Sequence, residues 1–370
     1  NFKFYGDTSP GSATDFHGTA IAGIIGARAG NGKGIRGVAP KVFLIPQNIA
    51  EPTERPYQSL YRLLDSLLGD YDINNMSYSF PDRRPLNTDA NVYAAIEFAA
   101  VSKRSRRGVI EVKAAGDYFA DGIDNCFDPL NRNPYVIVVG AISGDGIRST
   151  YSSLGTCQWV AAPGGEDGVL FPGIVTTDTS GCKKGDAKDT GIKSGFNYGH
   201  PQNPNCDYSA TVNGSGVAAA LVSGVVALML EVNPLLSWRD IKYILAKTSR
   251  KNLGLGSLLG LTIEEESATL LAEFARTHHW VTNSAGFSYN PEYGFGLINT
   301  AAAIDYAKKL RDNPGPADSV YWPRFTKIES KVKSLTATIP DGDLAGSTIE
   351  IVVPASDNLM VESFSLDTTG

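Results

Sequence analysis

The sequence predicts an α/β fold: a mostly parallel sheet with helices on both faces. Three observations support this class. β-type and helical segments alternate along the chain, several β-type segments are continuously apolar, and glycine- or proline-containing turns separate them. Strands that alternate with helices are typical of a parallel sheet, and helices that cover both faces leave such strands buried.

The elements are expected in the following order. A β-type run covers Val42–Ile49, and the helical spacing of Leu and Tyr predicts a helix over Tyr57–Leu68. A strand over Tyr71–Phe80 ends at a turn. The later elements are an amphipathic helix over Val92–Lys103, buried strands over Gly108–Ala115, Tyr135–Ala141 and Trp159–Ala162, a polar loop over Ser180–Asn205, an apolar helix over Val217–Leu230, and a helix over Trp238–Thr248 with Ser237 as N-cap.

The chain changes character near residue 312, which predicts a domain boundary. Asp312-Asn313-Pro314-Gly315-Pro316 is a linker signal, and short β-type runs follow at Ser334–Ile339 and Ser347–Val353. We therefore assign residues 1–312 to one domain and residues 313–370 to the start of a separate all-β domain. The second part is too short for a whole sandwich, which usually needs about 100 residues.

Composition and charge exclude several classes of protein. The 370 residues are 42% hydrophobic and 19% charged, which is ordinary for a globular chain. A net charge of -6 argues against a general nucleic-acid binder. No uninterrupted apolar stretch is long enough for a membrane span, because Ser223 and Gly224 interrupt Val217–Leu230. We expect Asn1 and Gly370 to be internal positions of a longer protein.

The four cysteines leave two interpretations open. Cys126, Cys157, Cys182 and Cys206 form no Cys-x-x-Cys pair and none has a His at metal-ligand spacing. An even number in a loop-rich chain favours disulfides and a secreted or periplasmic location. Four buried thiols in a cytosolic protein fit the composition about as well.

Three segments carry residues suited to chemistry. His17 precedes a helix of small apolar residues, a good position for a general base. Asn213-Gly214-Ser215-Gly216 opens the later apolar helix, where free backbone N–H groups suit an oxyanion. Asp117 follows a buried strand, so its side chain is expected at the carboxyl edge of the sheet.

Together these segments resemble the subtilisin-like serine proteases. The motifs are His17-Gly18-Thr19, Asn75-Met76-Ser77, Ala114-Ala115-Gly116-Asp117 and Asn213-Gly214-Ser215-Gly216 with Val222-Ser223-Gly224. Asp124-Asn125-Cys126, Ser237-Trp238-Arg239-Asp240 and Tyr293-Gly294-Phe295-Gly296 resemble the kexin/furin-like proprotein convertase branch. The resemblance implies a three-layer subtilisin-like fold, followed by part of a P domain at residues 313–370.

The family cleaves peptide bonds with a Ser/His/Asp triad and an oxyanion-binding Asn. In this alignment His17 is the base, Ser215 takes the position of a Thr, and Gly216 takes the position of the nucleophilic Ser. Asp117 takes the position of the oxyanion Asn. The triad Asp lies in a strand well before the His, and only sixteen residues precede His17, so we expect that strand to be missing. A one-residue shift would instead make Ser215 the nucleophile.

Substrate recognition is the better-preserved part of the resemblance. Ser77-Tyr78-Ser79 corresponds to the edge that pairs with an extended peptide. Asp82 matches the acid that receives a basic substrate side chain, and Asp128 is a candidate second acid. The alternative for Asp82 is an ordinary turn residue.

The resemblance also implies disulfides and calcium. Cys126 and Cys157 match a family disulfide, and Cys182 and Cys206 would then close the polar loop. Candidate calcium ligands are Asp7, Asn31 and Asp124, although a calcium site needs six to eight oxygens.

Two functions follow as hypotheses. The first is a secreted or periplasmic serine endopeptidase that cleaves polypeptides, after basic residues, and is inactive in this form because Gly216 and Asp117 replace reacting groups. The alternative is a pseudoprotease that binds peptides without hydrolysing them. The sequence gives no oligomeric state.

Overall fold

The computed structural model describes residues 16–47, 49, 56–80, 90–166, 171–187, 200–251 and 280–312. All of them belong to one unit of the chain, residues 1–322. The predicted start of an all-β domain at residues 313–370 lies outside the described residues and stays a prediction.

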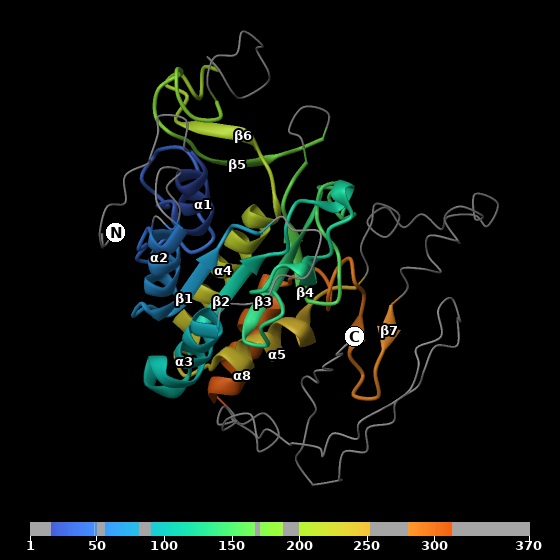
Figure 1. Ribbon diagram of the computed structural model, residues 1–370. Coiled ribbons are helices and arrows are strands. Elements are labelled where there is room, and N and C mark those ends of the chain that lie inside the picture. Colours follow the sequence, from blue (N-terminus) through green and yellow to red (C-terminus); the bar gives the residue numbers. More distant parts are fainter. Residues whose placement is uncertain are drawn as a thin grey trace, which may run out of the picture. The chain divides into compact units, whose positions relative to one another are not determined.

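A four-stranded parallel sheet forms the centre of the fold, in the order β1-β2-β3-β4 (Figure 1). The strands are β1 (Ile73–Met76), β2 (Ile110–Ala114), β3 (Val136–Ile142) and β4 (Gln158–Pro163). Every residue of β2 and β3 is buried, as expected for central strands covered on both faces. The predicted parallel sheet is confirmed, although β1 ends at Met76 and not at Phe80.

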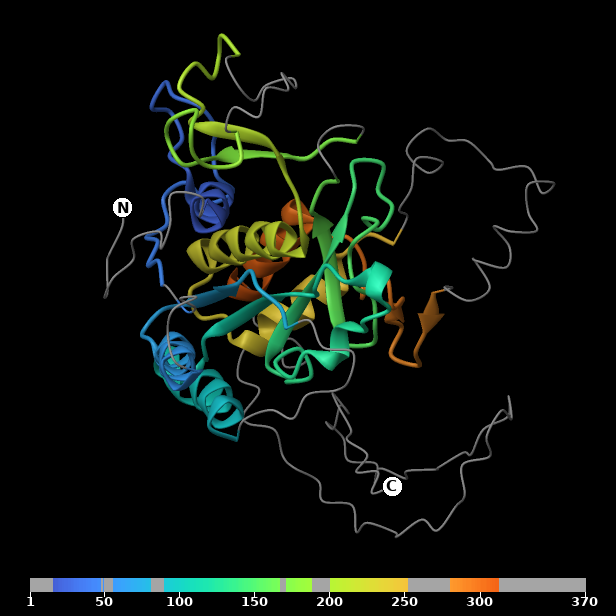
Figure 2. The same ribbon diagram turned by 45° about the horizontal axis from the view of Figure 1, so that its top comes forward.

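Helices cover both faces of this sheet and produce the predicted three layers. α4 (Ser215–Val232) crosses one face beside α5 (Trp238–Thr248) and α8 (Thr300–Asp312), whereas α2 (Pro56–Leu68) and α3 (Ala90–Arg106) pack together on the other side (Figures 1 and 2). The predicted N-cap of α5 is confirmed, because Ser237 Oγ accepts a hydrogen bond from the Asp240 N–H at 3.2 Å. α8 was not predicted.

α4 is the central helix of the domain. Its length and hydropathy would suffice to cross a membrane, but 67% of that stretch is buried inside the fold. It contacts all four strands of the sheet as well as α1 (His17–Gly26) and α8. Small residues permit this close packing: a Cβ added at Gly224 would lie 2.5 Å from Val38 Cβ. We therefore interpret α4 as a core helix.

A small antiparallel sheet lies over α1. It pairs β5 (Ile174–Thr177) with β6 (Tyr208–Val212), and the polar segment predicted as a loop lies between these strands. The Thr176 and Thr177 hydroxyls donate to the Ala20 and Thr19 carbonyl oxygens, at 2.6 and 2.7 Å. This sheet was not predicted. A second antiparallel pair, β7 (Val281–Thr282) and β8 (Ser288–Tyr289), precedes α8.

The prediction of a strand over Val42–Ile49 was wrong for the described residues of that run. Only Leu44 forms an isolated bridge there. Pro46 has no N–H to donate to a neighbouring strand, and Phe43 is 63% exposed. The run is hydrophobic, but its residues do not alternate between a buried and an exposed face.

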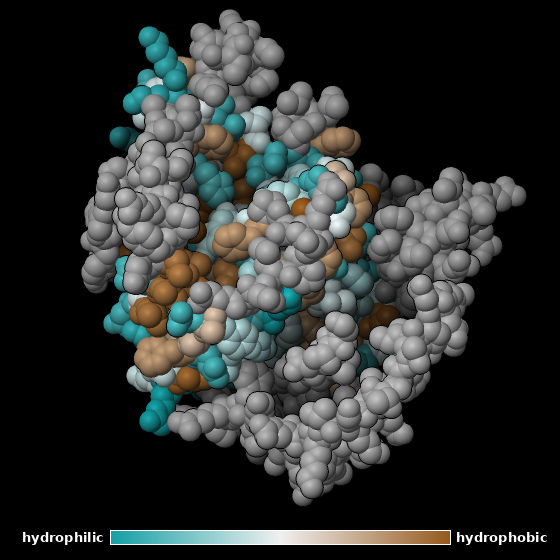
Figure 3. Space-filling view, viewed as in Figure 1, coloured by the Kyte–Doolittle hydropathy of each residue, from teal (hydrophilic) through white to brown (hydrophobic). Residues whose placement is uncertain are grey.

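Hydrophobic side chains gather on the surface over α2 and α3 (Figure 3). The large exposed residues of these helices are Leu68, Tyr93, Phe98 and Val101. Exposed apolar area of this kind is common on protein surfaces.

Candidate active site

The candidate residues meet where the parallel strands end. Ser77 follows β1, and Gly116 and Asp117 follow β2. The N-terminus of α4 reaches the same edge, because the Gly214 N–H donates to the Gly164 carbonyl, which follows β4, at 3.1 Å. Parallel strands bring their carboxyl ends to one edge, where α/β proteins commonly place their sites.

Ser215 is turned into the protein. It is 1% exposed, and its Oγ accepts a hydrogen bond from the Gly116 N–H at 3.0 Å. Its own N–H donates to Asp117 Oδ1 at 2.8 Å. The Ser215 hydroxyl therefore has a structural partner at the end of β2.

The turn before α4 requires glycine. Gly214 has φ +130°, and a Cβ at this position would lie 3.1 Å from Asp117 Oδ2. The Gly214 N–H also donates to the Tyr151 hydroxyl at 2.9 Å, and that hydroxyl donates to the Gly165 carbonyl at 2.8 Å. These bonds fix the backbone that leads into Ser215 and Gly216.

Gly216 lies directly against Ser77. A Cβ added at Gly216 would come within 3.0 Å of the Ser77 carbonyl oxygen and 3.1 Å of Ser77 Cβ. The Ser77 hydroxyl donates to the Gly216 carbonyl at 2.6 Å and accepts from Asn75 Nδ2 at 2.9 Å. The Ser223 hydroxyl donates to Asn75 Oδ1 at 2.8 Å, which links this network to α4. The space beside the Gly216 Cα is therefore bounded by Ser77.

His17 and Asp117 are coupled electrostatically. His17 is exposed at the start of α1, and α1 packs on α4 through a cluster that includes Ala20, Ile24 and Val217. Burial raises the pKa of the Asp117 carboxyl, while hydrogen bonding from Ser215 and the charge on His17 act against this rise. Asp117 is therefore the residue that the structure connects to both Ser215, by a hydrogen bond, and His17, by its charge.

Two charged side chains, Lys113 and Asp128, form hydrogen bonds with the backbone of the segment Ser77–Phe80. Lys113, on β2, donates from Nζ to the Tyr78 carbonyl at 2.6 Å and to Asp128 Oδ2 at 2.7 Å. The Phe80 N–H donates to the same Asp128 oxygen at 3.1 Å. Asp82 lies outside the described residues. Asp128, the candidate second acid for a basic substrate residue, therefore binds a lysine of the same chain.

Lys113 was missed as a site residue. The sequence contained one signal, a lysine in a strand that was predicted to be buried and that carries one other charged residue, Glu111. A buried charge requires a partner, and the structure shows that this partner is Asp128.

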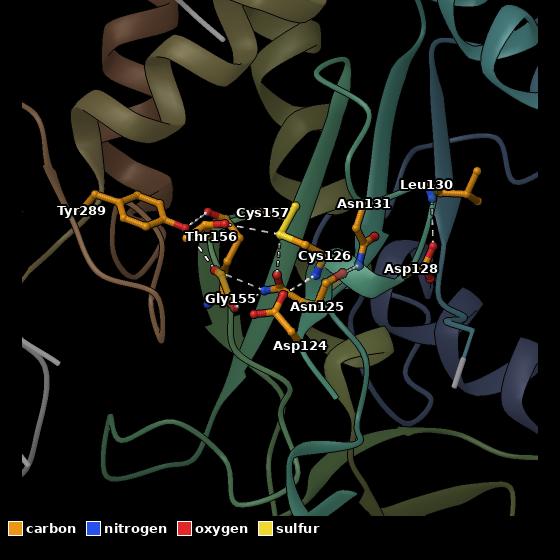
Figure 4. The surroundings of a disulfide bond; sticks show 11 residues. Asp124, Asn125, Cys126, Asp128, Leu130, Asn131, Gly155, Thr156, Cys157 and Tyr289 are labelled. Carbon is orange, nitrogen blue, oxygen red and sulfur yellow. Dashed lines mark hydrogen bonds between the residues drawn. A yellow bond between two sulfur atoms is a disulfide. The ribbon is translucent and has the colours of Figure 1, made fainter. Parts of the chain in front are cut away.

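Both disulfides implied by the resemblance are confirmed. Cys126 is joined to Cys157 and Cys182 to Cys206. Around the first disulfide, Asp124 Oδ1 accepts from the Cys126 N–H at 2.7 Å and Asn131 Nδ2 donates to the Asn125 carbonyl at 2.9 Å (Figure 4). This disulfide holds the turn that leads into Asp128.

The candidate calcium ligands do not assemble a site in the described part of the chain. Asp7 lies outside it, Asn31 Oδ1 accepts from the Lys33 N–H at 3.0 Å, and Asp124 caps a short 3₁₀ turn. Within the described ranges, no three His, Cys, Asp or Glu side chains form a group fit for a metal ion. Six to eight oxygens would be needed.

Comparison with known proteins gives a consistent result. The model of the subtilase family, Peptidase S8, matches residues 1–296. The extracellular serine protease of Aeromonas sobria is 30% identical, over 98% of this chain and 61% of that protein. The crystal structure of the Aeromonas sobria serine protease superimposes with a TM-score of 0.69 at 27% identity, covering 84% of this chain and 56% of that one.

Two further relatives extend the comparison. Human proprotein convertase subtilisin/kexin type 7 is 30% identical over 58% of this chain and 22% of that protein. A calcium-dependent protease of Trichormus variabilis is 27% identical over 83% of this chain and 42% of that protein. The chain therefore spans less than two thirds of the length of each of these relatives.

Proposed function

The chain belongs to the subtilase family, and we propose that it is a peptide-binding member that does not hydrolyse its ligand. One observation carries the proposal. At the N-terminus of α4, Gly216 offers no side chain and the neighbouring Ser215 hydroxyl is buried against the Gly116 N–H.

A serine nucleophile has to reach the scissile carbonyl and give its proton to a base. Ser215 Oγ accepts a hydrogen bond from a buried backbone group and is 1% exposed. Turning it toward a substrate would leave the Gly116 N–H without its partner, which costs about 1–3 kcal/mol. In subtilisin, loss of the nucleophilic Ser lowers kcat by about 2 × 10⁶.

Asp117 removes a second requirement of hydrolysis. The backbone N–H groups at a helix N-terminus suit a developing oxyanion, but the Ser215 N–H already donates to the Asp117 carboxylate. An ionised carboxylate donates no hydrogen bond and repels the negative charge that forms during acyl transfer. Loss of one oxyanion donor lowers kcat by about 10²–10³.

Peptide binding is proposed for the segment Ser77-Tyr78-Ser79. The Tyr78 carbonyl and the Phe80 N–H face Lys113 and Asp128. Backbone groups of successive residues in an extended segment point to opposite sides, so Ser79 is expected to present its N–H and carbonyl outward. An extended peptide would pair with these groups as an added strand.

The relatives also support proposals for the location of the protein, for calcium binding and for a further domain. The matched Aeromonas sobria protein is extracellular, and the two disulfides suit an oxidising compartment, so we propose secretion. Calcium dependence is a property named for the Trichormus relative, and calcium binding by this chain, with Asp7, Asn31 and Asp124 as candidate ligands, stays a proposal. A partial P domain at residues 313–370 is a further proposal.

The test of peptide binding uses the full chain and fluorescein-labelled octapeptides. Ser79→Pro removes the outward N–H and is expected to abolish binding, whereas Ser79→Ala keeps that N–H and should retain it. Equal binding by both variants would contradict pairing at this edge. Mass spectrometry of the bound peptides should return them uncleaved.

The alternative is an endopeptidase that uses Ser215. Its support is the family itself, since the matched Aeromonas and human relatives are proteases by name. It predicts that the native chain cleaves peptides and that Ser215→Ala removes the cleavage.

A further inference from the structure

Lys113 is an unusual residue for the centre of a parallel sheet. It lies on β2 between Val112 and Ala114 and is 0% exposed. Its Nζ lies 5.0 Å from the centre of the Tyr78 ring and 5.8 Å from that of Phe80, so both aromatic residues contribute cation–π contacts. The ammonium group therefore lies directly beneath the segment proposed to bind peptide.

Asp128 is fully occupied by partners within the chain. Its Oδ2 accepts from Lys113 Nζ at 2.7 Å and from the Phe80 N–H at 3.1 Å, and its Oδ1 accepts from the Leu130 N–H at 2.9 Å. It is 3% exposed. A cation arriving with a substrate would have to displace the Lys113 ammonium to reach this carboxylate.

Lys113 and Asp128 balance each other in charge, and this disfavours the approach of a further charged group. Lys113 Nζ and Asp128 Oδ2 lie 2.7 Å apart, so one cation faces one anion. Burial lowers the pKa of Lys113, and the neighbouring Asp128 carboxylate opposes this fall. A second cation would face the ammonium at short range with little solvent to screen it. A carboxylate on the peptide would lose its hydration and gain little in return, because Asp128 already neutralises the Lys113 ammonium.

We propose that Lys113 determines the specificity of this site. Its ammonium occupies the position at Asp128 that a basic side chain of a peptide would need. The Ser77–Phe80 segment therefore selects peptides that place an uncharged, apolar or aromatic residue beside Phe80. This inference rests on the proposed function, because it presupposes that a peptide binds along Ser77–Ser79. Phe80, which is 37% exposed, supplies an apolar ring at this place.

The test is a set of octapeptides in which one position at a time carries Leu, Phe, Arg, Lys or Glu, with dissociation constants measured on the full chain. The native protein should bind the best Leu or Phe peptide at least about tenfold more tightly than its Arg, Lys and Glu counterparts. Lys113→Met should reverse this order in favour of Arg, since it leaves Asp128 without a cation.

The double variant Lys113→Met with Asp128→Asn is the matched control. It removes both charges, keeps an acceptor for the Phe80 N–H and should retain the preference for uncharged residues. Thermal unfolding is followed for each variant. If Lys113→Met does not fold, the inference is tested by the order of dissociation constants measured on the native protein and on the double variant.

Three results would overturn the inference. One is an Arg or Lys preference in the native chain. Another is a folded Lys113→Met that gains no affinity for Arg peptides. The third is a double variant that prefers Arg. Absence of binding by every peptide would instead refute the proposed function, and this inference with it, so the two failures are distinguishable.

Discussion

The N-terminus of α4 and the segment Ser77–Phe80 lie at the same edge of the sheet, but their polar groups are used differently. At α4, position 216 has no side chain and the Ser215 hydroxyl is bonded to the Gly116 N–H. At Ser77–Phe80, Lys113 and Asp128 bond to the backbone at Tyr78 and Phe80. In the first region position 216 offers no side chain, and in the second two charged side chains bond to the backbone. This contrast supports a protein that holds a peptide without cleaving it.

The largest expected effect comes from restoring the reacting groups at α4. Gly216→Ser together with Asp117→Asn supplies a hydroxyl and an amide donor at the carboxyl edge of the sheet. Cleavage of a labelled peptide should rise clearly above that of the native chain, and Gly216→Ser alone should be lower by about 10²–10³ because Asp117 remains. Ser77 has to move by a few tenths of an ångström, since the added Cβ would lie 3.0 Å from its carbonyl oxygen.

Adding His17→Ala to the double variant is the control for this experiment. Activity that survives the loss of His17 would show that the cleavage does not come from this site. Activity in the native chain equal to that of the double variant would remove the contrast between the two regions.

The free energy of unfolding tests whether the Lys113–Asp128 ion pair holds the segment Ser77–Phe80. Asp128→Ala leaves the Lys113 ammonium buried without its carboxylate and should lower the free energy of unfolding by about 3–5 kcal/mol. Lys113→Met with Asp128→Asn removes both charges and should cost much less. Chemical denaturation measures both. Equal losses in the two proteins would mean that the ion pair does not hold this region.

The free energy of unfolding should also depend on pH, because another buried ionisable residue, Glu111, lies on β2. Glu111 lies on β2 two residues before Lys113; burial raises its pKa to about 8, and a hydrogen bond from Asn74 acts in the opposite direction. The folded state therefore holds a proton that the unfolded chain releases near pH 4.5. The stability contributed by protonated Glu111 is present below that pH and is lost as the pH rises toward 8, at up to about 1.4 kcal/mol per pH unit.

Glu111→Gln should flatten this dependence, because a neutral amide replaces the titrating carboxyl. Unfolding free energies at pH 5, 6, 7 and 8 test it. An unchanged slope in the variant would assign the pH dependence to other groups.

The smallest expected effect concerns Ser215. Ser215→Ala leaves the Gly116 N–H without its hydroxyl partner and should lower the free energy of unfolding by about 1–3 kcal/mol. Peptide affinity should stay the same. A large loss of affinity without a loss of stability would show that the hydroxyl faces the ligand.

The sequence predicted much of the fold because the central elements have strong local patterns. β2 and β3 are continuously buried, and α5 carries a capping box at Ser237 and Asp240, so each was identified. The family resemblance and the subtilisin-like fold are confirmed. β5 and β6 were missed because they are short and partly polar, and they pair across the long polar segment that separates them in the chain.

The site was predictable where a residue type alone decides the chemistry. Gly216 has no side chain in any fold, so its effect on a serine mechanism is visible in the sequence. The role of Lys113 depends instead on Asp128, fifteen residues away, and on the Tyr78 carbonyl in the segment that follows β1. Only the folded arrangement shows that Asp128 is already paired.

The most direct test of peptide binding without hydrolysis measures peptide cleavage by the native chain beside Ser215→Ala, with binding recorded on the same samples. We expect both proteins to bind the peptide and to leave it uncleaved. Cleavage by the native chain that disappears in Ser215→Ala would contradict this expectation, because Ser215 would then be the nucleophile.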